Sequence, residues 1–292
     1  MRSLLFVPGD SPRKLAKGLE SGADALILDL EDSVAADRKA PARASAAAFI
    51  RQAVQQAKRP RLIVRVNGLA TGLTDADLDA VVPARPDAIL LPKAEGGASV
   101  IHADAKLAAR EAIAGLDEGH VKIVAQAFET ATGLFAAGSL AGASTRLIGL
   151  TWGPEDLSAE VGAEANRDAD GHLTGPYRFA RSICLFAAAA AQVTAIETVY
   201  VDFRNLAGLK RETEEARRDG FTARLAIHPA QVAVINEVFT PTAEAVARAK
   251  KIVAAFAASP GGGVVAIDGV MYDRPHLARA HALIARAQEA GL

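Results

Sequence analysis

Charged residues that could do chemistry stand at the ends of short apolar runs in this chain. Arg65 lies in one such run, Lys93 follows the next, and Glu129 and Asp156 follow the two after that. If the runs are parallel strands of a barrel, their carboxyl ends meet at one face, so two cations and two carboxylates would share one cavity. A polar residue at one strand end is ordinary; the convergence of four singles out this group.

Glu129 and Asp156 form a candidate metal site. Consecutive barrel strands lie about 4.8 Å apart, so the two carboxylates could approach closely, and they would repel each other unless a positive group lay between them. Mg²⁺ suits such a pair, because it takes one or two protein carboxylates and completes its octahedron with water and substrate oxygens. No cluster of His or Cys has the ligand spacing of a zinc site. The spacing alone leaves open an ordinary polar strand end.

Arg65 is the predicted anion-binding group of this site. Its planar, permanently charged guanidinium suits bidentate pairing with a substrate carboxylate, or an oxygen on which negative charge develops. A salt bridge from Arg65 to Asp29 or Glu31 inside the barrel mouth is the structural alternative, and it is compatible with a catalytic role.

Two further residues have open interpretations. Lys93 at a strand end could be a Schiff-base lysine, but two neighbouring carboxylates would stabilise its charged form and favour an electrostatic role. His228 precedes a proline and could either act directly or hydrogen-bond the barrel rim. Dinucleotide-binding, Walker and nucleophile-elbow motifs are missing from the sequence, as is a glycine-rich phosphate loop after the last two runs.

The elements that must position these residues are eight short apolar runs, separated by alanine-rich stretches with helical spacing. Continuously apolar strands are typical of a parallel sheet that is covered on both faces. The pattern predicts a (β/α)₈ TIM barrel, with an open doubly wound sheet as the alternative. The predicted strands are 3–7, 25–30, 62–66, 88–91, 121–127, 147–150, 198–201 and 225–227.

Two segments depart from this alternation. Residues 151–197 contain no convincing strand, and their turn-rich piece Asn166–His172 reads as an active-site flap or a surface loop. After residue 227 the pattern is helical to about Ala258, where Ser259–Gly263 forms a flexible break. The sequence thus predicts a catalytic barrel over residues 1–258 and a C-terminal tail and helix over 259–292.

Composition limits the class of protein. The chain has 292 residues, is 50% hydrophobic and 23% charged, and has a net charge of -1. Such values are typical of a packed globular protein and give no reason to expect nucleic acid or an anionic membrane as a partner. No apolar run approaches the roughly 20 residues of a membrane span. We therefore expect a cytoplasmic protein, in which the single cysteine, Cys184, is a buried small hydrophobe.

The chain contains six ordered motifs and a tail, namely Arg2–Gly9, Asp29–Val34, Arg65–Asn67, Leu91–Glu95, Glu129–Thr130, Gly153–Leu157 and the tail Asp268–Pro275. In this order they resemble the citrate lyase beta-subunit-like branch of the HpcH/HpaI aldolase family. The resemblance extends from the first strand into the C-terminal tail and therefore covers essentially the whole chain. The tail also looks like the segment that closes the neighbouring subunit's site in malyl-CoA and citramalyl-CoA lyases.

The resemblance implies a Mg²⁺-dependent carbon–carbon lyase, with Mn²⁺ as a substitute. Its substrate would be a 3-hydroxyacyl thioester of coenzyme A, such as a citryl, malyl or citramalyl thioester, and its products an acyl-CoA and a 2-oxo acid. The alternatives are the beta subunit of a multi-subunit citrate lyase, which acts on a citryl acyl-carrier protein, and a 2-oxo-acid aldolase that needs no thioester. A partner-dependent subunit or a binding protein without turnover is the alternative from another class.

The resemblance also assigns roles to residues and partners. It implies a homo-oligomer, a trimer or hexamer, with acyl-carrier and transferase subunits as further candidate partners. The implied roles are metal ligation by Glu129 and Asp156, polarisation of the scissile-centre oxygen by Arg65, proton transfer by Asp273 supplied in trans, shaping of the site by Glu31 and Asp32, and contacts with the substrate or its carrier by Arg2, Lys14, Lys93, Gly153 and Pro154.

Overall fold

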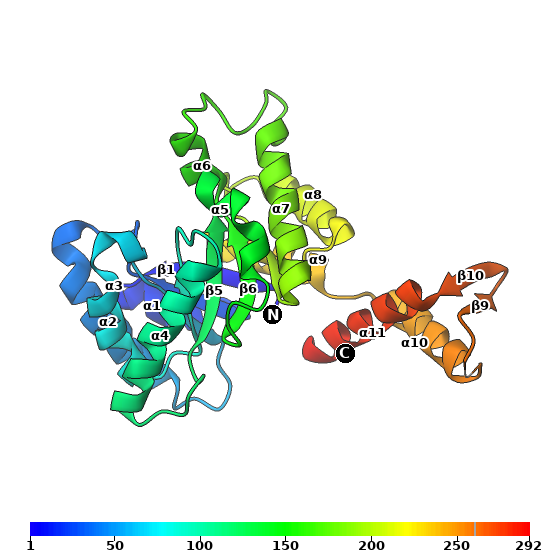
Figure 1. Cartoon of the computed structure of the whole chain (residues 1–292), viewed down its shortest axis with the longest axis horizontal. Helices are drawn as coiled ribbons and strands as arrows, with labels where there is room; N and C mark the ends of the chain where they lie inside the picture. The colour runs from blue at the N-terminus through cyan, green and yellow to red at the C-terminus, as the bar shows by residue number, and fades with distance from the viewer. Residues whose placement is uncertain (260) are drawn as a thin grey trace.

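The computed structural model of the chain describes residues 1–259 and 261–292. Its centre is a closed barrel of eight parallel strands in chain order, in which β8 pairs with β1. Figure 1 shows barrel strands surrounded by helices. This confirms the predicted TIM barrel over the open sheet. The strands are β1 (Ser3–Pro8), β2 (Ala25–Asp29), β3 (Arg61–Arg65), β4 (Ala88–Leu91), β5 (Lys122–Phe128), β6 (Leu147–Trp152), β7 (Thr194–Glu197) and β8 (Ala223–Ala226).

Helices surround the barrel and are started by proline or capping residues. Pro12, Pro154, Pro176 and Pro229 each stand in the first turn of a helix, where a missing N–H costs nothing. The barrel helices are α1 (Pro12–Leu19), α2 (Lys39–Ala53), α3 (Thr74–Val81), α4 (Gly97–Ala114), α5 (Ala131–Phe135), α6 (Pro154–Glu160), α7 (Gly175–Ala191), α8 (Leu206–Asp219) and α9 (Pro229–Phe239).

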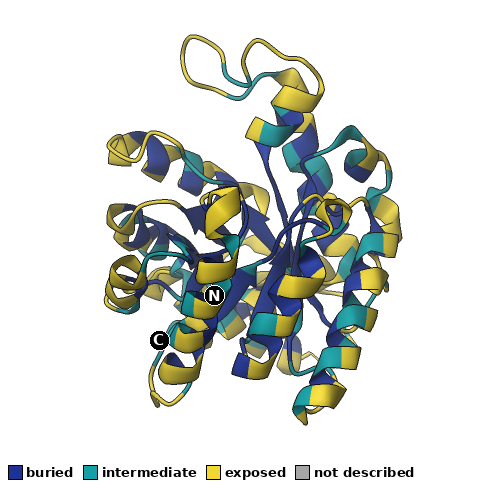
Figure 2. Cartoon of the chain, turned by 90° about the vertical axis from the view of Figure 1, so that its left-hand side faces the viewer, coloured by how far each residue is buried: buried dark blue, intermediate teal, exposed yellow. Residues whose placement is uncertain are grey.

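The strands are buried on both faces, as their continuous apolar runs predict. In β1, Leu4 points into the barrel and packs with Ile27 and Ile63, whereas Leu5 points out and packs beneath the helices. Figure 2 shows the same division, with buried strands at the centre and helices exposed on their outer sides. The barrel interior is therefore a packed core, and any cavity must lie at its rim.

One predicted strand is misplaced. The seventh strand is Thr194–Glu197, not residues 198–201, and it lies within the segment that was expected to lack a strand. Barrel closure explains the difference, since Gly149 and Leu150 of β6 pair with Thr194 and Ala195. The more apolar residues 198–201 form the loop after the strand. Residues 166–172 form an exposed loop between α6 and α7.

The C-terminal extension folds as a separate small unit. It contains α10 (Ala243–Ala257), the antiparallel hairpin of β9 (Val264–Ile267) and β10 (Val270–Asp273), and α11 (Arg274–Glu289). These elements share a hydrophobic cluster of their own and project from the barrel in Figure 1. The division at residue 258 remains a prediction, and the packing of α10 favours an earlier boundary, between α9 and α10.

Candidate active site

A cavity of about 360 Å³ lies at the carboxyl ends of the barrel strands, and several of the predicted residues line it. Glu31, Lys93 and Glu129 lie behind the lining and contact Arg65, Asp156 and Gln126. Its charged and amide side chains lie at the ends of β2, β3 and β5 and on α6. Its apolar side chains come mainly from β1, β6 and β8 and from the loops after β7 and β8. The lining residues are Phe6, Pro8, Asp29, Asp32, Ser33, Arg65, Gln126, Trp152, Gly153, Pro154, Glu155, Asp156, Thr198, Val199, Leu225 and Ile227.

Arg65 is held rigidly in this cavity by three carboxylates. Its Nε and Nη2 atoms each donate to Asp29 at 2.7 Å, and its Nη1 atom lies 3.1 Å from Glu31 Oε2 and 3.6 Å from Asp32 Oδ2. Burial lowers the pKa of Arg65, but the hydrogen bonds and charge of Asp29 outweigh it and raise the pKa. The guanidinium lies 4.8 Å from the ring centroid of Phe6. The salt-bridge alternative is thus present, and it orients a permanent cation toward the cavity.

Lys93 links the two sides of the charged cluster. Its Nζ atom donates to Glu31 Oε1 at 2.9 Å and lies 3.4 Å from Asp156 Oδ1. Burial lowers the pKa of Lys93, but Glu31, Asp156 and Glu129 outweigh it and raise the pKa, which disfavours a neutral Schiff-base amine. The residue has a φ of 49°, a left-handed backbone that is uncommon outside glycine. This conformation directs the Lys93 N–H at Glu129 Oε2, 2.9 Å away.

Glu129 is the most deeply buried carboxylate of the cluster. It is 1% exposed, and burial, reinforced by the nearby charge of Asp156, raises its pKa to about 8. Gln126 donates its amide to the other carboxylate oxygen, Oε1. Residue 153 must be glycine for this packing, because a Cβ there would lie 2.7 Å from Glu129 Oε1. The chain thus buries a carboxylate and leaves its charge incompletely balanced.

The residues present fit a Mg²⁺ ion held by Glu129 and Asp156. A cation would compensate the buried Glu129 charge, and the unpartnered Gln126 Oε1 marks polar space beside it. Across residues 1–259 and 261–292, no three His, Cys, Asp or Glu side chains form a metal-binding group. A full protein cage is therefore lacking, but Mg²⁺ takes only one or two carboxylates and fills its remaining positions with water and substrate oxygens.

The structure distributes the other predicted residues unevenly. Gly153 and Pro154 line the cavity. Arg2 lies at the opposite, amino-terminal end of the barrel, where it donates to Asp24 and to the Thr240 hydroxyl. The prediction that Arg2 meets a carrier thus finds no support within this chain, because a residue that precedes a parallel strand starts at the wrong face. Lys14 is exposed on α1 and does not line the cavity.

Asp273 lies away from the cavity of its own chain. It caps the first turn of α11 in the extension, where its side chain pairs with His276 and this hydrogen bond lowers its pKa. Among the described residues, none from the extension lines the cavity. A role at this mouth would therefore require the Asp273 of another copy, as the resemblance implies, and it remains a prediction.

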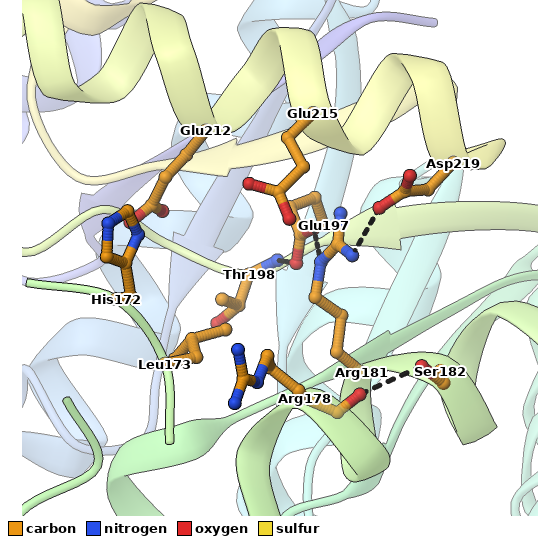
Figure 3. A pocket seen from close by; sticks show the side chains of 10 residues that line it. All are labelled: His172, Leu173, Arg178, Arg181, Ser182, Glu197, Thr198, Glu212, Glu215 and Asp219. Carbon is orange, nitrogen blue, oxygen red and sulfur yellow. Dashed lines mark hydrogen bonds and ion pairs between the residues drawn. The ribbon is translucent and has the colours of Figure 1, made fainter. Parts of the chain in front are cut away.

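Two residues that line the cavity, Gln126 and Trp152, and a third behind its wall, Glu197, were not predicted. Gln126 stands inside an apolar run, and a polar residue in a buried strand is the signal that could have identified it. Trp152 forms a wall of the cavity, and its Nε1 atom donates to Glu197 at 2.7 Å. Glu197 also lines a second pocket, which lies between α7 and α8 and is shown in Figure 3. In that pocket Arg181 donates hydrogen bonds to both Glu197 and Asp219.

The remaining sequence interpretations have structural outcomes. His228 caps α9 in a capping box with Gln231 and stacks on Phe203 at 4.8 Å, which supports the structural alternative for this histidine. Cys184 is buried, as expected, and burial raises the pKa of its thiol. Of the helices in the described part of the chain, none has the length and apolar character to span a bilayer.

Comparison with known proteins places this geometry in context. The chain is 37% identical over 289 residues to a (3S)-malyl-CoA thioesterase of Cereibacter sphaeroides, covering 98% of this chain and 94% of the relative. It is 35% identical over 286 residues to a citrate lyase subunit beta-like protein of Mycobacterium tuberculosis, with coverages of 98% and 95%.

A solved structure shares the whole fold. The crystal structure of CitE from M. tuberculosis in complex with magnesium, acetoacetate and coenzyme A matches with a TM-score of 0.77 and 33% identity, over 98% of each chain. The family model of the HpcH/HpaI aldolase/citrate lyases matches residues 2–229, the span that holds the barrel and its cavity. This chain therefore belongs to the HpcH/HpaI aldolase/citrate lyase family, a family of lyases, as its motifs predicted.

Proposed function

We propose that this protein is a Mg²⁺-dependent carbon–carbon lyase, which cleaves a 3-hydroxyacyl-CoA to an acyl-CoA and a 2-oxo acid. The observation that carries the proposal is one charged cluster, in which Arg65 and Asp156 line the cavity and Lys93 and Glu129 lie directly behind the lining residues. A buried carboxylate beside a second one supports a divalent cation, and the fixed guanidinium supports an anionic substrate. The magnesium and coenzyme A in the related crystal structure support both ligands.

Different residues of the chain would have different roles in cleavage. Bound between Glu129 and Asp156, Mg²⁺ would act as a Lewis acid that lowers the pKa of the substrate hydroxyl. Arg65, held in place by Asp29 and Glu31, would orient the carboxylate and stabilise negative charge at the scissile-centre oxygen. The Lys93 ammonium, between Glu31 and Asp156, would offset part of the negative charge of these two carboxylates.

As the substrate hydroxyl loses its proton to solvent at the open mouth, its oxygen forms the C=O bond of the 2-oxo acid and the C–C bond breaks. The electron pair that this leaves on the acetyl carbon needs a proton. Three of the acidic residues that line this cavity, Asp29, Asp32 and Asp156, already pair with Arg65 or Lys93. We propose Asp273 of a neighbouring copy as the proton donor, in a homo-oligomer whose extensions close one another's mouths. Its own His276 would stay paired with it as it changes protonation state.

Hydrolysis of the thioester is a second candidate function, favoured by the 37% identical relative that is named a (3S)-malyl-CoA thioesterase. In that case water would attack the thioester carbonyl, and the C–C bond would stay intact. The products differ, because hydrolysis of malyl-CoA yields malate and free coenzyme A, whereas cleavage yields glyoxylate and acetyl-CoA.

The first experiment incubates the purified full chain with malyl-CoA, citramalyl-CoA or citryl-CoA and Mg²⁺, and follows the 2-oxo acid, acetyl-CoA and free coenzyme A separately. Formation of a 2-oxo acid with acetyl-CoA supports the lyase, and free coenzyme A without a 2-oxo acid supports the thioesterase. Absence of both products from the isolated chain, with activity restored by acyl-carrier and transferase subunits, would favour the citrate lyase beta-subunit alternative.

A second experiment tests the shared site. Deletion of residues 261–292 should abolish turnover while leaving a folded barrel, because the barrel core contains no residue of that segment. Mixing the truncated chain with Arg65→Ala should restore part of the activity, since one chain supplies an intact mouth and the other an intact tail. Full activity of the truncated chain alone would refute the role of Asp273.

A further inference from the structure

The part of the cavity that β1, β6, β8 and the loops after β7 and β8 line is almost free of polar groups, and it borders the charged cluster where Arg65 lies over the Phe6 ring. Phe6, Trp152, Val199, Leu225 and Ile227 line it, and we call these five residues the apolar half of the mouth. Trp152 offers no donor to a ligand, because its single N–H is bonded to Glu197 behind the wall. The nearby Thr198 contributes a hydroxyl, which is neutral.

The cavity also lacks a spare cation. Among the residues that line it in the described part of the chain, Arg65 is the one basic side chain, and Asp29 and Glu31 already pair with it. The neighbouring Lys93 is shared between Glu31 and Asp156. Four further lining residues, namely Asp29, Asp32, Glu155 and Asp156, are acidic. A second substrate carboxylate would therefore meet no free positive partner.

The geometry of the hydroxyl-bearing carbon directs its substituents. Its hydroxyl and its carboxylate belong on the charged side, near Glu129, Asp156 and Arg65. Its thioester arm must leave through the opening, because coenzyme A is far larger than a cavity of about 360 Å³. The fourth substituent is then left against the apolar half, which accepts hydrogen or methyl but would desolvate a carboxymethyl group without pairing its charge.

We infer that the apolar half restricts this protein to thioesters whose hydroxyl-bearing carbon carries hydrogen or a small alkyl group, and excludes the carboxymethyl substituent of a citryl thioester. This inference rests on the proposed function and narrows its substrate class. The expected 2-oxo acid products are therefore monocarboxylates such as glyoxylate or pyruvate, and not oxaloacetate. The 2-oxo acid taken up in the synthetic direction has the same restriction.

Steady-state kinetics of the full chain with malyl-CoA, citramalyl-CoA and citryl-CoA test the inference. We expect kcat/KM for citryl-CoA to be lower by at least about 100-fold than for the better of the other two, because a buried charge without a partner is strongly rejected. A smaller difference would overturn the inference while leaving the proposed lyase activity intact.

A charge-restoring variant makes the test specific. Ile227 lines the apolar half and is 40% exposed, so an arginine can be accommodated there. Ile227→Arg should raise the citryl-to-malyl ratio of kcat/KM at least tenfold, whereas the matched uncharged variant Ile227→Gln should not. Val199→Arg, with Val199→Gln as its control, repeats the test at a second position if the first variant unfolds. An unchanged ratio in a folded arginine variant would contradict the charge argument.

Ligand binding keeps the inference testable if no thioester is cleaved, a result that would refute the proposed function alone. Water-proton relaxation of the Mn²⁺-loaded protein reports displacement of metal-bound water by an added 2-oxo acid. We expect pyruvate to bind at least about tenfold more tightly than freshly dissolved oxaloacetate, which differs by one carboxylate. Equal binding of the two acids, or binding of neither, would overturn the inference.

Discussion

The two halves of the barrel mouth differ in the kind of side chain that lines them: one half is charged and the other is apolar. The charged half holds Arg65, Lys93 and Glu129 in a network where each ion has at least one partner within the cavity wall. In the apolar half the Trp152 N–H donates to Glu197 behind the wall, so it is not available to a ligand. Under the proposed function the charged half binds and polarises the substrate, and the apolar half restricts which substrate is accepted. Reaction and selectivity would then depend on different strands of one barrel.

Removing the buried carboxylate of the charged half should have the largest effect. Glu129→Gln keeps the shape but lacks the charge that would hold Mg²⁺, so we expect kcat/KM to fall by about 10³-fold or more. Mg²⁺-dependent turnover and Mn²⁺ affinity by water-proton relaxation measure the loss. The control is Glu95→Gln on an exposed residue nearby. Normal metal affinity in Glu129→Gln would rule out Glu129 as a ligand.

A conservative change at Arg65 should cost less. Arg65→Lys retains a positive charge but cannot donate in parallel to Asp29 while also facing Glu31. We expect kcat/KM to fall about 10²-fold, comparable to the loss of one donor that stabilises a developing oxyanion. Steady-state kinetics at saturating Mg²⁺ provide the measurement. Full activity of the lysine variant would show that charge alone suffices.

A substitution at Glu197, which lies behind the wall of the apolar half, should lower the stability of the fold. Glu197 is 3% exposed and accepts hydrogen bonds from Trp152, Arg181 and the Thr198 N–H. Glu197→Gln removes the charge that Arg181 pairs with, so we expect a destabilisation of about 2 kcal/mol, as for a hydrogen bond to a charged group. Urea unfolding measures it, with Glu215→Gln, an exposed carboxylate of the same pocket, as the control. Equal free energies of unfolding for wild type and Glu197→Gln would show that Glu197 does not stabilise this wall.

The smallest effect that we expect is a loss of stability at low pH, because protonation of Asp29 weakens its pairing with Arg65 in the charged half. Burial alone would raise the pKa of Asp29, but the hydrogen bonds and charge of Arg65 outweigh it and lower the pKa. The folded pKa then lies below the unfolded value of about 3.9. The stabilisation is therefore complete above that value and disappears as the pH falls through the folded pKa. Urea midpoints of wild type and Asp29→Asn should converge with decreasing pH, and a constant difference would contradict this role.

The charged half could be predicted from the sequence because it follows a simple rule. In a parallel barrel every strand end reaches the same face, so residues that follow apolar runs must converge. Arg65 and Asp156 line one cavity, and Glu129 is bonded to Lys93 and Gln126 beside it. The same rule argues against Arg2, which precedes a strand and lies at the other end. The seventh strand was misplaced because the run after it is more apolar than Thr194–Glu197 itself.

The apolar half could not be predicted in this way. A strand that is buried on both faces shows no alternation, so the sequence does not reveal that Phe6 and Leu225 face the cavity. The partnership of Trp152 with Glu197 joins residues that are 45 positions apart. Neither a local pattern nor the position after a run indicates such a contact.

The sequence by itself determined the barrel, the order of its strands and the charged residues at their ends, because these depend on hydrophobic patterning and chain direction. Only the tertiary structure decided which carboxylate is buried, how Lys93 directs its N–H at Glu129, and which side chains close the cavity opposite them. Burial and facing depend on strand tilt and on neighbours that the chain brings together from distant positions. The selectivity inferred for this protein depends on that second kind of information.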